Sequence, residues 1–370
     1  MASGSETISV LDQEGAIRPS AAAEPYADRA LGTSMEQRIG FLRDMVRVRA
    51  FDVAAANLQR QGQLALWVSS YGQEAAQVGS ARATRVQDTV FPAYREHAVG
   101  MIRGLDLLEI IRLYRGSVHG GWDPAESGFR QYCLVIGSQT LHATGYAMGL
   151  QLDGATATGD PDTDAAVVVY FGDGATSQGD SNEALVFASS YRTPTVFFIQ
   201  NNHWAISVPV ERQSRVPLAD RASGFGMPGV RLDGNDVLAS FAVTGALLDD
   251  ARAGRGPALI EALTYRIQGH SSSDDPTKYR SEEELQRWMQ RDPILRLRRH
   301  LEGEGVGADV FETIDAEAAD LAADVRRRTL ELPDPPMSDL FAHVYSEPHP
   351  LMDEQLQWLR DYEASYGSDR

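Results

Sequence analysis

Two short apolar runs separated by a helical repeat lie in the middle of the chain, and this arrangement limits the fold more than any other feature. The runs occupy 164–174 and 193–202 and are rich in β-branched and aromatic residues. Runs of this kind are typical of parallel strands buried on both faces. Between them, apolar side chains recur at helical spacing from Glu183 to Tyr191. We therefore expect an α/β fold, in which a right-handed crossover joins parallel strands and helices cover both faces of the sheet.

Oxygen-bearing side chains follow both predicted strands. The first strand ends in Gly172-Asp173-Gly174 and the second in Asn201-Asn202. Because the carboxyl ends of parallel strands meet at one edge of a sheet, these side chains should converge on one crevice. Oxygen ligands of this kind suit Mg²⁺ or Ca²⁺, and Mg²⁺ usually completes its shell with phosphates and water. The sequence therefore predicts a site for a metal ion and a diphosphate, where the glycines let the backbone approach the phosphates.

Two common nucleotide-binding motifs also use glycines, and neither fits this segment. A dinucleotide fingerprint requires a third glycine where this chain has Ser177, and its acidic residue lies about 20 residues further on. A P-loop requires a Gly-Lys-Ser/Thr sequence, which is absent here. The plainer alternative is a turn at 172–174 and a simple strand cap at 201–202. We favour the site because a single crossover joins the two segments.

The composition argues against several other classes of protein. With 34 Lys+Arg and 52 Asp+Glu, the net charge is −18, so we expect no nucleic-acid partner. The single cysteine, Cys133, excludes an intrachain disulfide and a multi-cysteine zinc site, and it fits a reducing compartment. No apolar run approaches the roughly 20 residues of a membrane helix, and the first residues do not resemble a secretory signal. We therefore expect a cytoplasmic protein without a membrane partner.

The chain divides into three predicted parts. Residues 1–33 are polar and rich in Ala, Ser and Pro, so we expect an extended arm that is ordered only against a partner. Residues 34–300 should form the α/β domain, and residues 301–370 a helical C-terminal extension packed on that same domain. The remaining predicted elements are helices at Met35–Leu58, Gln73–Ala83, 281–288 and 310–330, a short helix near Asp353, and a third strand at 256–270.

Residues 172–207 resemble the thiamin-diphosphate motif of the 2-oxo acid dehydrogenase family. They are most similar to the alpha subunit of its decarboxylating first component, of the bacterial branched-chain or pyruvate type. The family motif reads GDG, EALNFA and ENNxYAIS, and this chain reads GDG, EALVFA and QNNHWAIS. The resemblance covers about residues 35–345 and implies the thiamin-diphosphate-binding fold, with thiamin diphosphate and Mg²⁺ as cofactors. It implies that Asp173, Asn202 and the backbone carbonyl of Trp204 hold Mg²⁺.

Two further segments resemble the same family. FPAYREH at 91–97 resembles its YREH stretch, which implies that Tyr94 and Arg95 contact the diphosphate. VIGSQTLHATGYAMG at 135–149 resembles its VGAQxPxAxG segment, which implies that Ile136 lies under the bent cofactor and that Gly137 leaves room for its aminopyrimidine ring. The full set of expected cofactor-binding residues is Tyr94, Arg95, Ile136, Gly137, Gly172, Asp173, Gly174, Ala175, Gln200, Asn202, Trp204 and His270.

The resemblance also implies two catalytic histidines. Residues 264–284 resemble the TYRxxGHSxSDDxxxYR stretch, so His270 corresponds to the active-site histidine. His119, in RGSVHGG, matches the GSMH of the family. Ser271 matches a serine that mitochondrial relatives phosphorylate, and we expect it to be unregulated here. Four residues should order the loop around His270: Arg266, Asp274, Tyr279 and Arg280. The other histidines are expected to be structural: His97, His142, His203, His300, His343 and His349.

We expect the chain to hold the diphosphate half of a thiamin site, and 370 residues with the motif near the middle leave no evident room for a pyrimidine-binding domain. The resemblance therefore implies a beta subunit that supplies the missing glutamate, in an α₂β₂ heterotetramer. The implied reaction is oxidative decarboxylation of a small 2-oxo acid, followed by acyl transfer to the lipoyl group of a dihydrolipoyl acyltransferase. The contexts at 58–64, 72–80 and 273–275 favour substrates of the 3-methyl-2-oxobutanoate class, ahead of pyruvate and acetoin. A non-catalytic thiamin-binding assembly subunit and a nucleotide-dependent dehydrogenase stay open as alternatives.

Overall fold

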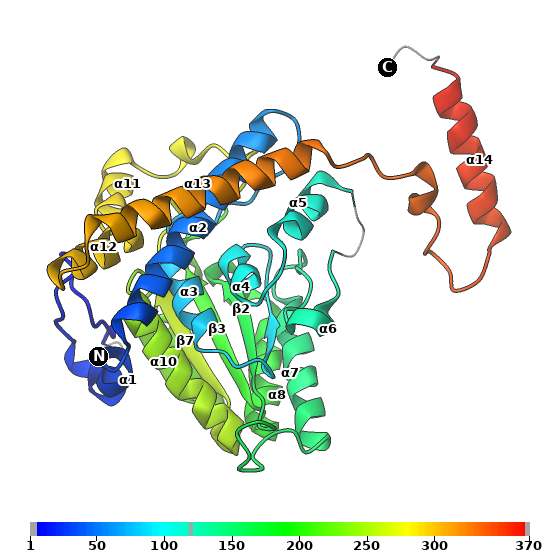
Figure 1. The fold of residues 1–370 in the computed structure, drawn as a ribbon. Helices are drawn as coiled ribbons and strands as arrows, with labels where there is room; N and C mark the ends of the chain where they lie inside the picture. Colours follow the sequence, from blue (N-terminus) through cyan, green and yellow to red (C-terminus); the bar gives the residue numbers. More distant parts are fainter. Residues whose placement is uncertain (1–5, 118–120, 367–370) are drawn as a thin grey trace.

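The protein is built around a parallel β-sheet, seen in a computed structural model that describes residues 6–117 and 121–366. The strands of the sheet are β1 (Thr89–Phe91), β2 (Val167–Gly172), β3 (Thr195–Asn201), β6 (Gly229–Asp233) and β7 (Ala258–Leu263). Their spatial order is β1-β2-β3-β7-β6, and every pairing between them is parallel. The predicted α/β class is therefore confirmed (Figure 1).

The strand–helix–strand unit forms as predicted. Helix α8 (Gly179–Tyr191) connects β2 to its parallel neighbour β3. The register runs from Val167 opposite Thr195 to Gly172 opposite Gln200, so the two strands end side by side. This register places the segments that follow them at one edge of the sheet.

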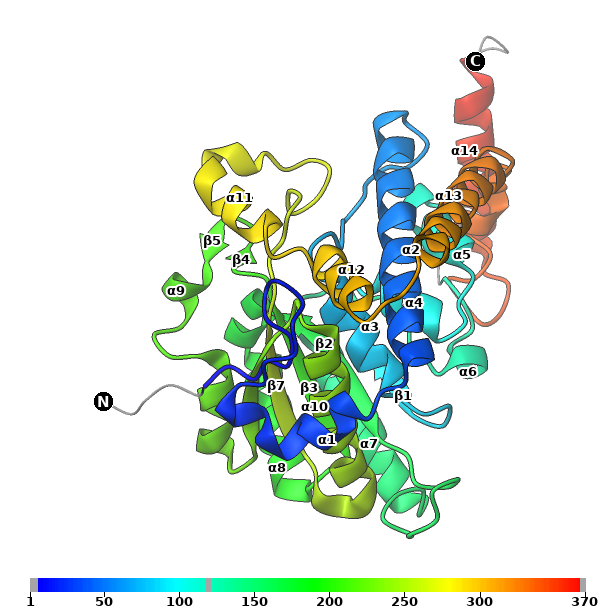
Figure 2. The ribbon, with the colours of Figure 1, turned by 60° about the vertical axis from the view of Figure 1, so that its left-hand side comes forward.

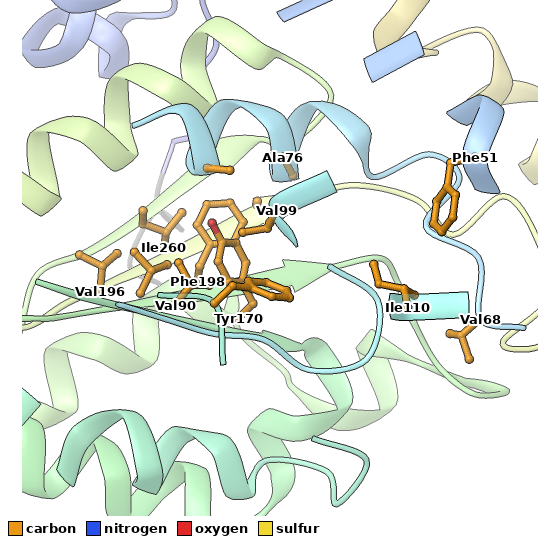
Figure 3. Packing of buried hydrophobic residues seen from close by; sticks show 14 of the residues in the cluster. Phe51, Val68, Ala76, Val90, Val99, Ile110, Tyr170, Val196, Phe198 and Ile260 are labelled. Atoms are coloured by element: carbon orange, nitrogen blue, oxygen red, sulfur yellow. The ribbon is translucent and has the colours of Figure 1, made fainter. Parts of the chain in front are cut away.

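Helices cover both faces of the sheet because alternate strand residues point to opposite sides. Tyr170 and Phe198 pack on one face with Ala76 of α3 (Glu74–Arg82), as Figure 3 shows. Phe171 and Phe197 pack on the other face, against α8 and α7 (Ser138–Leu152). The strands are buried on both sides, which explains their nearly continuous apolar sequence.

The expectation that the N-terminal segment is ordered only against a partner is wrong. Ile8 forms a parallel bridge with Leu232 of β6. The buried carboxylate of Asp236 accepts hydrogen bonds from the backbone N–H groups of Val10 (2.6 Å) and Leu11 (2.7 Å). Both of these side chains are almost fully buried. A few apolar residues within a polar context therefore fix the segment to the domain of its own chain.

The predicted C-terminal extension consists of two different parts. Helix α13 (Ala308–Leu330) packs along α2 (Met35–Arg60), as expected. Helix α14 (Pro350–Ala364) points away from the rest of the molecule in Figures 1 and 2, and none of its residues is buried. The expectation that the whole extension packs on the domain is therefore wrong for α14. The proposed boundary at residue 300 also falls inside a helix, α12 (Pro293–Gly303).

The predicted helices at 35–58, 73–83, 281–288 and 310–330 are confirmed, with their ends shifted by only a few residues. The third strand is shorter than predicted, because the chain leaves the sheet after Leu263 and forms a loop.

Among the described residues, no helix is long and apolar enough to cross a membrane. The other helices and short strands are α1 (Ala27–Leu31), α4 (His97–Ile102), α5 (Leu107–Arg115), α6 (Pro124–Ser127), β4 (Trp204–Ala205), β5 (Val208–Pro209), α9 (Val210–Gln213), α10 (Val237–Asp250) and α11 (Glu282–Met289). The 3₁₀ turns are Ala21–Tyr26, Asp173–Ser177, Leu218–Phe225, Pro276–Lys278 and Met337–Leu340, and a π turn spans Ala251–Arg255.

Candidate active site

A cavity of about 250 Å³ opens at the carboxyl edge of β2 and β3. All the expected cofactor-binding residues line it: Tyr94, Arg95, Ile136, Gly137, Gly172, Asp173, Gly174, Ala175, Gln200, Asn202, Trp204 and His270. The second predicted catalytic residue, His119, lies outside the described residues. The fold thus brings segments that are almost 180 residues apart in the sequence to one crevice.

Asp173 and Asn202 lie side by side at the ends of β2 and β3, and both are buried. The Oδ2 atom of Asp173 accepts a hydrogen bond from Nε2 of Gln213, at 2.8 Å. Nδ2 of Asn202 donates to Oε1 of Gln73, at 3.3 Å. Burial raises the pKa of the Asp173 carboxyl above its ordinary value. A bound cation would oppose this effect, because an adjacent positive charge favours the ionised carboxylate.

The backbone carbonyl of Trp204 is the third expected metal ligand. Its oxygen accepts a hydrogen bond from Nη1 of the fully buried Arg266, at 3.2 Å. A carbonyl oxygen has two lone pairs, so one of them is left for a metal ion. The described residues contain no cluster of three or more His, Cys, Asp and Glu side chains that would hold a metal ion. One carboxylate, one amide and one carbonyl fit an ion that takes its remaining ligands from phosphate and water.

Arg95 is a buried cation whose guanidinium contacts backbone carbonyls, an imidazole and the ring of Tyr94, whose centroid lies 5.8 Å away. Nη1 donates to the carbonyl of Ser69, and Nη2 donates to the carbonyl of His270 at 3.0 Å. Within the described residues, no carboxylate forms an ion pair with Arg95, whose exposed fraction is 6%. A buried charge is costly unless an opposite charge lies next to it. The cavity is therefore electrostatically suited to an anion such as a diphosphate.

Two buried amides lining the cavity have unused hydrogen-bonding capacity. Nε2 of Gln73 and Oε1 of Gln139 have no hydrogen-bond partner among the described residues, although both residues are almost fully buried. Unpaired buried polar atoms are rare in native proteins and require an explanation. A ligand bound in the cavity would explain both atoms, since it would accept a hydrogen bond from Nε2 of Gln73 and donate one to Oε1 of Gln139.

A buried glutamate supports the floor of the cavity. Oε1 of Glu96 accepts a hydrogen bond from Nε2 of Gln200, whose Oε1 accepts from Gln77 at 3.1 Å. Burial raises the pKa of Glu96 to about 7. The amide of Gln200 is thus occupied by protein groups on both sides.

Among the residues that line the cavity, sequence reasoning missed Gln73, Ala93, Glu96, Cys133, Gln139, Gln178, Ala205 and Ile206.

The loop that carries His270 is ordered by the four residues named from the resemblance. Oδ2 of Asp274 accepts hydrogen bonds from the backbone N–H of His270, at 2.6 Å, and from the hydroxyl of Tyr279. Arg280 donates to the backbone carbonyl of Arg266, at 2.6 Å. Burial, together with the charges of Arg95 and Arg266, lowers the pKa of His270 to about 4. In the cofactor-free chain this imidazole is therefore neutral at pH 7.

Gly137 occupies a position that only glycine fits well. Its φ is +86°, and a Cβ atom there would lie 2.8 Å from Oγ of Ser181. The neighbouring Ile136 is 40% exposed at the wall of the cavity. An exposed isoleucine beside a glycine turn leaves an apolar surface that a ligand can cover.

Residues 42–334 match the family model described as the dehydrogenase E1 component. The chain belongs to this family. It is an alpha-type chain of a 2-oxo acid dehydrogenase, a thiamin-dependent oxidoreductase. The resemblance found in the sequence is therefore confirmed.

Curated relatives of this E1 chain cover almost its full length. It is 44% identical over 340 residues to the 3-methyl-2-oxobutanoate dehydrogenase subunit alpha of Mycobacterium tuberculosis (strain ATCC 25618 / H37Rv), covering 91% of this chain and 90% of that one. It is 34% identical to the pyruvate dehydrogenase E1 component subunit alpha of Bacillus subtilis (strain 168), covering 95% and 91%. Its identity to the corresponding subunit of Bacillus cereus is 32%, covering 97% and 94%.

Proposed function

We propose that this E1 chain holds Mg²⁺ and the diphosphate of thiamin diphosphate at the carboxyl edge of its sheet. The observation that carries the proposal is the buried guanidinium of Arg95, which forms no ion pair with a carboxylate of the described residues and lines the same cavity as Asp173 and Asn202. Asp173, Asn202 and the Trp204 carbonyl would ligate the ion, while Arg95 and Nε2 of Gln73 would donate to phosphate oxygens. When bound, thiamin diphosphate supplies the electron sink for decarboxylation.

We propose His270 as the catalytic residue that this chain contributes from its described part. Nη2 of Arg95 lies 3.5 Å from Nδ1 of His270, so the arginine donates to that nitrogen and Nε2 keeps the proton. A neutral imidazole with a protonated Nε2 can donate a hydrogen bond to a reacting oxygen. The negative charge of a diphosphate near Arg95 would raise the pKa of His270 towards its ordinary value. His119 stays a prediction as the second catalytic residue.

The proposed beta partner would cover an apolar surface next to the cavity. Leu134 and Val135, between β1 and α7, are 69% and 70% exposed. Gly145 and Gly149 on α7 face open space, where a Cβ atom would meet nothing within 4 Å. Exposed apolar residues beside small ones are typical of a protein interface. We propose an α₂β₂ heterotetramer that passes acyl groups to the lipoyl group of a dihydrolipoyl acyltransferase in the cytoplasm.

We propose branched-chain 2-oxo acids of the 3-methyl-2-oxobutanoate class as substrates. The 44% identity to a 3-methyl-2-oxobutanoate dehydrogenase subunit, against 32–34% for pyruvate dehydrogenase subunits, supports this choice. Pyruvate is the second candidate, because the pyruvate dehydrogenase subunits match 95–97% of the chain, against 91% for the branched-chain subunit. Acetoin and a non-catalytic assembly role have no observation in their favour.

The test compares the purified chain with the same chain coexpressed with its beta partner. Each sample is assayed with 3-methyl-2-oxobutanoate and with pyruvate, in the presence of thiamin diphosphate and Mg²⁺. We expect no turnover by the single chain and preference for the branched substrate by the pair. Turnover by the single chain would contradict the shared site, whereas preference for pyruvate would contradict only the choice of substrate.

The role of His270 has its own test in the coexpressed pair. We expect His270→Ala to leave the subunits assembled and to lower kcat about 10²-fold or more, as removal of an acid–base group does. His343→Ala, at an exposed histidine that does not line the cavity, is the control and should keep wild-type turnover. Wild-type turnover by His270→Ala would exclude a catalytic role.

A further inference from the structure

Asp52 of α2 is a buried carboxylate that does not line the cavity. Its exposed fraction is 3%. Oδ1 accepts a hydrogen bond from Nε1 of Trp67, at 2.7 Å, and Oδ2 accepts one from the hydroxyl of Ser69. Among the described residues, no cation forms an ion pair with this carboxylate. A buried carboxylate without a cation is costly, so its presence requires an explanation.

A second buried carboxylate on the same helix, Asp44, provides a comparison. Asp44 is 4% exposed and forms an ion pair with Arg82, whose Nε lies 2.7 Å from Oδ2 of the aspartate. Asp44 therefore has the cationic partner that Asp52 lacks. The two side chains that donate to Asp52 belong instead to one short segment, residues 67–70.

Residues 67–70 form neither a helix nor a strand, so other contacts must fix their backbone. All four residues are buried. Val68 belongs to the same hydrophobic cluster as Phe51, the residue that precedes Asp52 on α2 (Figure 3). Asp52 holds the segment by two of its four side chains. A satisfied buried network of this kind selects one backbone conformation.

The backbone of residues 67–70 contacts both groups that we assign to diphosphate binding. The carbonyl of Ser69 accepts a hydrogen bond from Nη1 of Arg95. The carbonyl of Ser70 accepts one from the backbone N–H of Gln73, at 3.0 Å. Arg95 and Gln73 both line the cavity. A shift of the Ser69 peptide would therefore move the guanidinium of Arg95 relative to a bound diphosphate.

The same segment holds the loop that carries His270. The backbone N–H of Trp67 donates to Oγ of Ser272, at 3.0 Å, and the backbone N–H of Ser272 donates to the carbonyl of Trp67, at 2.9 Å. Nη2 of Arg95 donates to the carbonyl of His270, at 3.0 Å. The loop is thus fixed to residues 67–70 directly at Ser272 and indirectly through Arg95.

We propose that Asp52 is a positioning residue for the E1 reaction, because its carboxylate fixes residues 67–70 and thereby Arg95 and the loop of His270. The inference rests on the proposed function, since it takes Arg95 as the diphosphate contact and His270 as the catalytic residue. The shortest route runs through Ser69, which bonds to Asp52 by its hydroxyl and to Arg95 by its carbonyl. Asp52 lies outside the cavity lining, so it acts only through such intermediates.

Asp52→Asn keeps the shape of the side chain and reverses one hydrogen bond. Nε1 of Trp67 can only donate, so the amide oxygen must face Trp67 and the amide nitrogen must face Ser69. The Ser69 hydroxyl already accepts from the backbone N–H of Tyr71, at 3.1 Å, and would now lose the acceptor for its own proton. We therefore expect the Ser69 peptide, and Arg95 with it, to lose a fixed position.

The test uses variants of the full-length chain coexpressed with the beta partner. We expect Asp52→Asn to weaken binding of thiamin diphosphate about tenfold in calorimetry and to lower kcat at saturating cofactor about tenfold, as loss of one hydrogen bond to a charged group does. Ser69→Ala, which removes the link and keeps the carboxylate, should weaken cofactor binding to the same extent. Asp44→Asn is the matched control and should change both quantities by less than about twofold. Denaturant unfolding checks that each variant folds.

A double substitution separates positioning from a general loss of stability. In the Arg95→Met background, Asp52→Asn should weaken cofactor binding further by less than about twofold, because the group on which it acts is absent. A variant Asp52→Asn that does not fold is replaced by Ser69→Ala, alone and with Arg95→Met, and the same comparison decides.

Three results would overturn the proposal. The first is wild-type cofactor binding and kcat in Asp52→Asn while Arg95→Met binds weakly. The second is an effect of Asp52→Asn that keeps its full size in the Arg95→Met background, and the third is an equal effect of Asp44→Asn. Wild-type binding by Arg95→Met itself would contradict the proposed function, and this inference with it.

Discussion

The two edges of the parallel sheet bury similar charged groups and use them in opposite ways. At the amino edge, the carboxylate of Asp88 accepts from the backbone N–H of Ala166 (2.9 Å), from that of Arg85 (2.6 Å), and from Nε and Nη2 of Arg252. Arg252 also pairs with Asp249, at 2.7 Å. At the carboxyl edge, the buried Arg95 contacts carbonyls and an imidazole, and it contacts no carboxylate in the part of the chain that the structure describes.

This comparison distinguishes the charges of Asp88 and Arg252, which stabilise the fold, from the charge of Arg95, which is available to a ligand. Asp88 and Arg252 satisfy each other, so a further ion would find no free capacity there. Arg95 forms no ion pair with a carboxylate of the described residues, and near it Gln73 and Gln139 each keep a polar atom without a partner among those residues. Burial alone does not mark the proposed active site. The combination of burial with unused charge and hydrogen-bonding capacity does.

The largest effect is expected at the amino edge. Asp88→Ala would leave buried Arg252 without its main partner. The backbone N–H groups of Arg85 and Ala166 would also lose the carboxylate that accepts their hydrogen bonds. We expect the free energy of unfolding to fall by about 3–5 kcal/mol, the usual cost of breaking a buried ion pair. Denaturant unfolding measures the change. Asp250→Ala removes the exposed pair with Arg255 and should cost less than about 1 kcal/mol. Equal effects of the two substitutions would contradict the structural role of Asp88.

The next effect is expected on binding rather than on stability. Asp173→Ala removes the only carboxylate among the proposed metal ligands, so the ion and the diphosphate would be poorly neutralised. We expect calorimetry on the coexpressed pair to show Mg²⁺-dependent binding of thiamin diphosphate weakened by about 100-fold or more, which is about 2.7 kcal/mol. Unfolding of the cofactor-free protein should change little. Wild-type affinity would exclude Asp173 as a ligand.

Arg95→Met provides the sharpest contrast with Asp88, because methionine keeps the apolar stem but not the charge. Loss of the diphosphate contacts should weaken binding of thiamin diphosphate by about 10- to 100-fold. The cofactor-free chain should keep its stability or gain some, since an uncompensated buried charge is removed. Both are measured on one preparation, by calorimetry and by denaturant unfolding. A loss of stability as large as that of Asp88→Ala would show that Arg95 is a structural cation.

The smallest effect concerns a buried group that belongs to neither edge. His97 accepts from the hydroxyl of Tyr132 (2.7 Å) and donates to the carbonyl of Val68 (2.8 Å). Burial lowers its pKa to about 3, whereas an unfolded chain has an ordinary value near 6.5. Between these values the unfolded state binds more protons, so the stability from His97 is complete well above pH 6.5 and is lost progressively as the pH falls through 6.5 towards 3.

From pH 8 to pH 6 the expected loss from His97 is about 0.8 kcal/mol. Denaturant unfolding of wild type and of His97→Gln at both pH values isolates this contribution. Asp52 and Glu96, whose pKa values are raised to about 6 and about 7, titrate in both proteins and largely cancel in the difference. The same pH dependence in His97→Gln as in wild type would show that another group is responsible.

The sequence was sufficient where the pattern is local. The strands at β2 and β3 and the helix between them follow from apolar runs and helical spacing, and their parallel register then brings Asp173 and Asn202 together. The family motifs extended this to Arg95 and His270. Each of these inferences uses residues close in sequence or segments joined by one crossover.

The sequence was insufficient where contacts are long-range. Whether Nε2 of Gln73 finds a hydrogen-bond partner depends on which distant segments pack around it. The local sequence GQEAAQ, at 72–77, therefore does not show that this atom is left without one. Val10 and Leu11 lie in a polar segment, and their burial depends on Asp236, 225 and 226 residues away. The neutral state of His270 likewise depends on two arginines from distant segments. The end of α13 likewise depends on a distant residue, since Arg115 donates to the carbonyls of Thr329 and Leu332.

The central claim is that the carboxyl edge of the sheet holds a metal ion and a diphosphate through groups that the protein leaves unpaired. A crystal structure of the assembled E1 component with thiamin diphosphate and Mn²⁺ in place of Mg²⁺ tests it, since anomalous scattering locates the ion. We expect one ion at ligand distance, about 2.1 Å, from Asp173, Asn202 and the Trp204 carbonyl, with phosphate oxygens against Arg95. An ion bound elsewhere, or a diphosphate that does not contact Arg95, would contradict the claim.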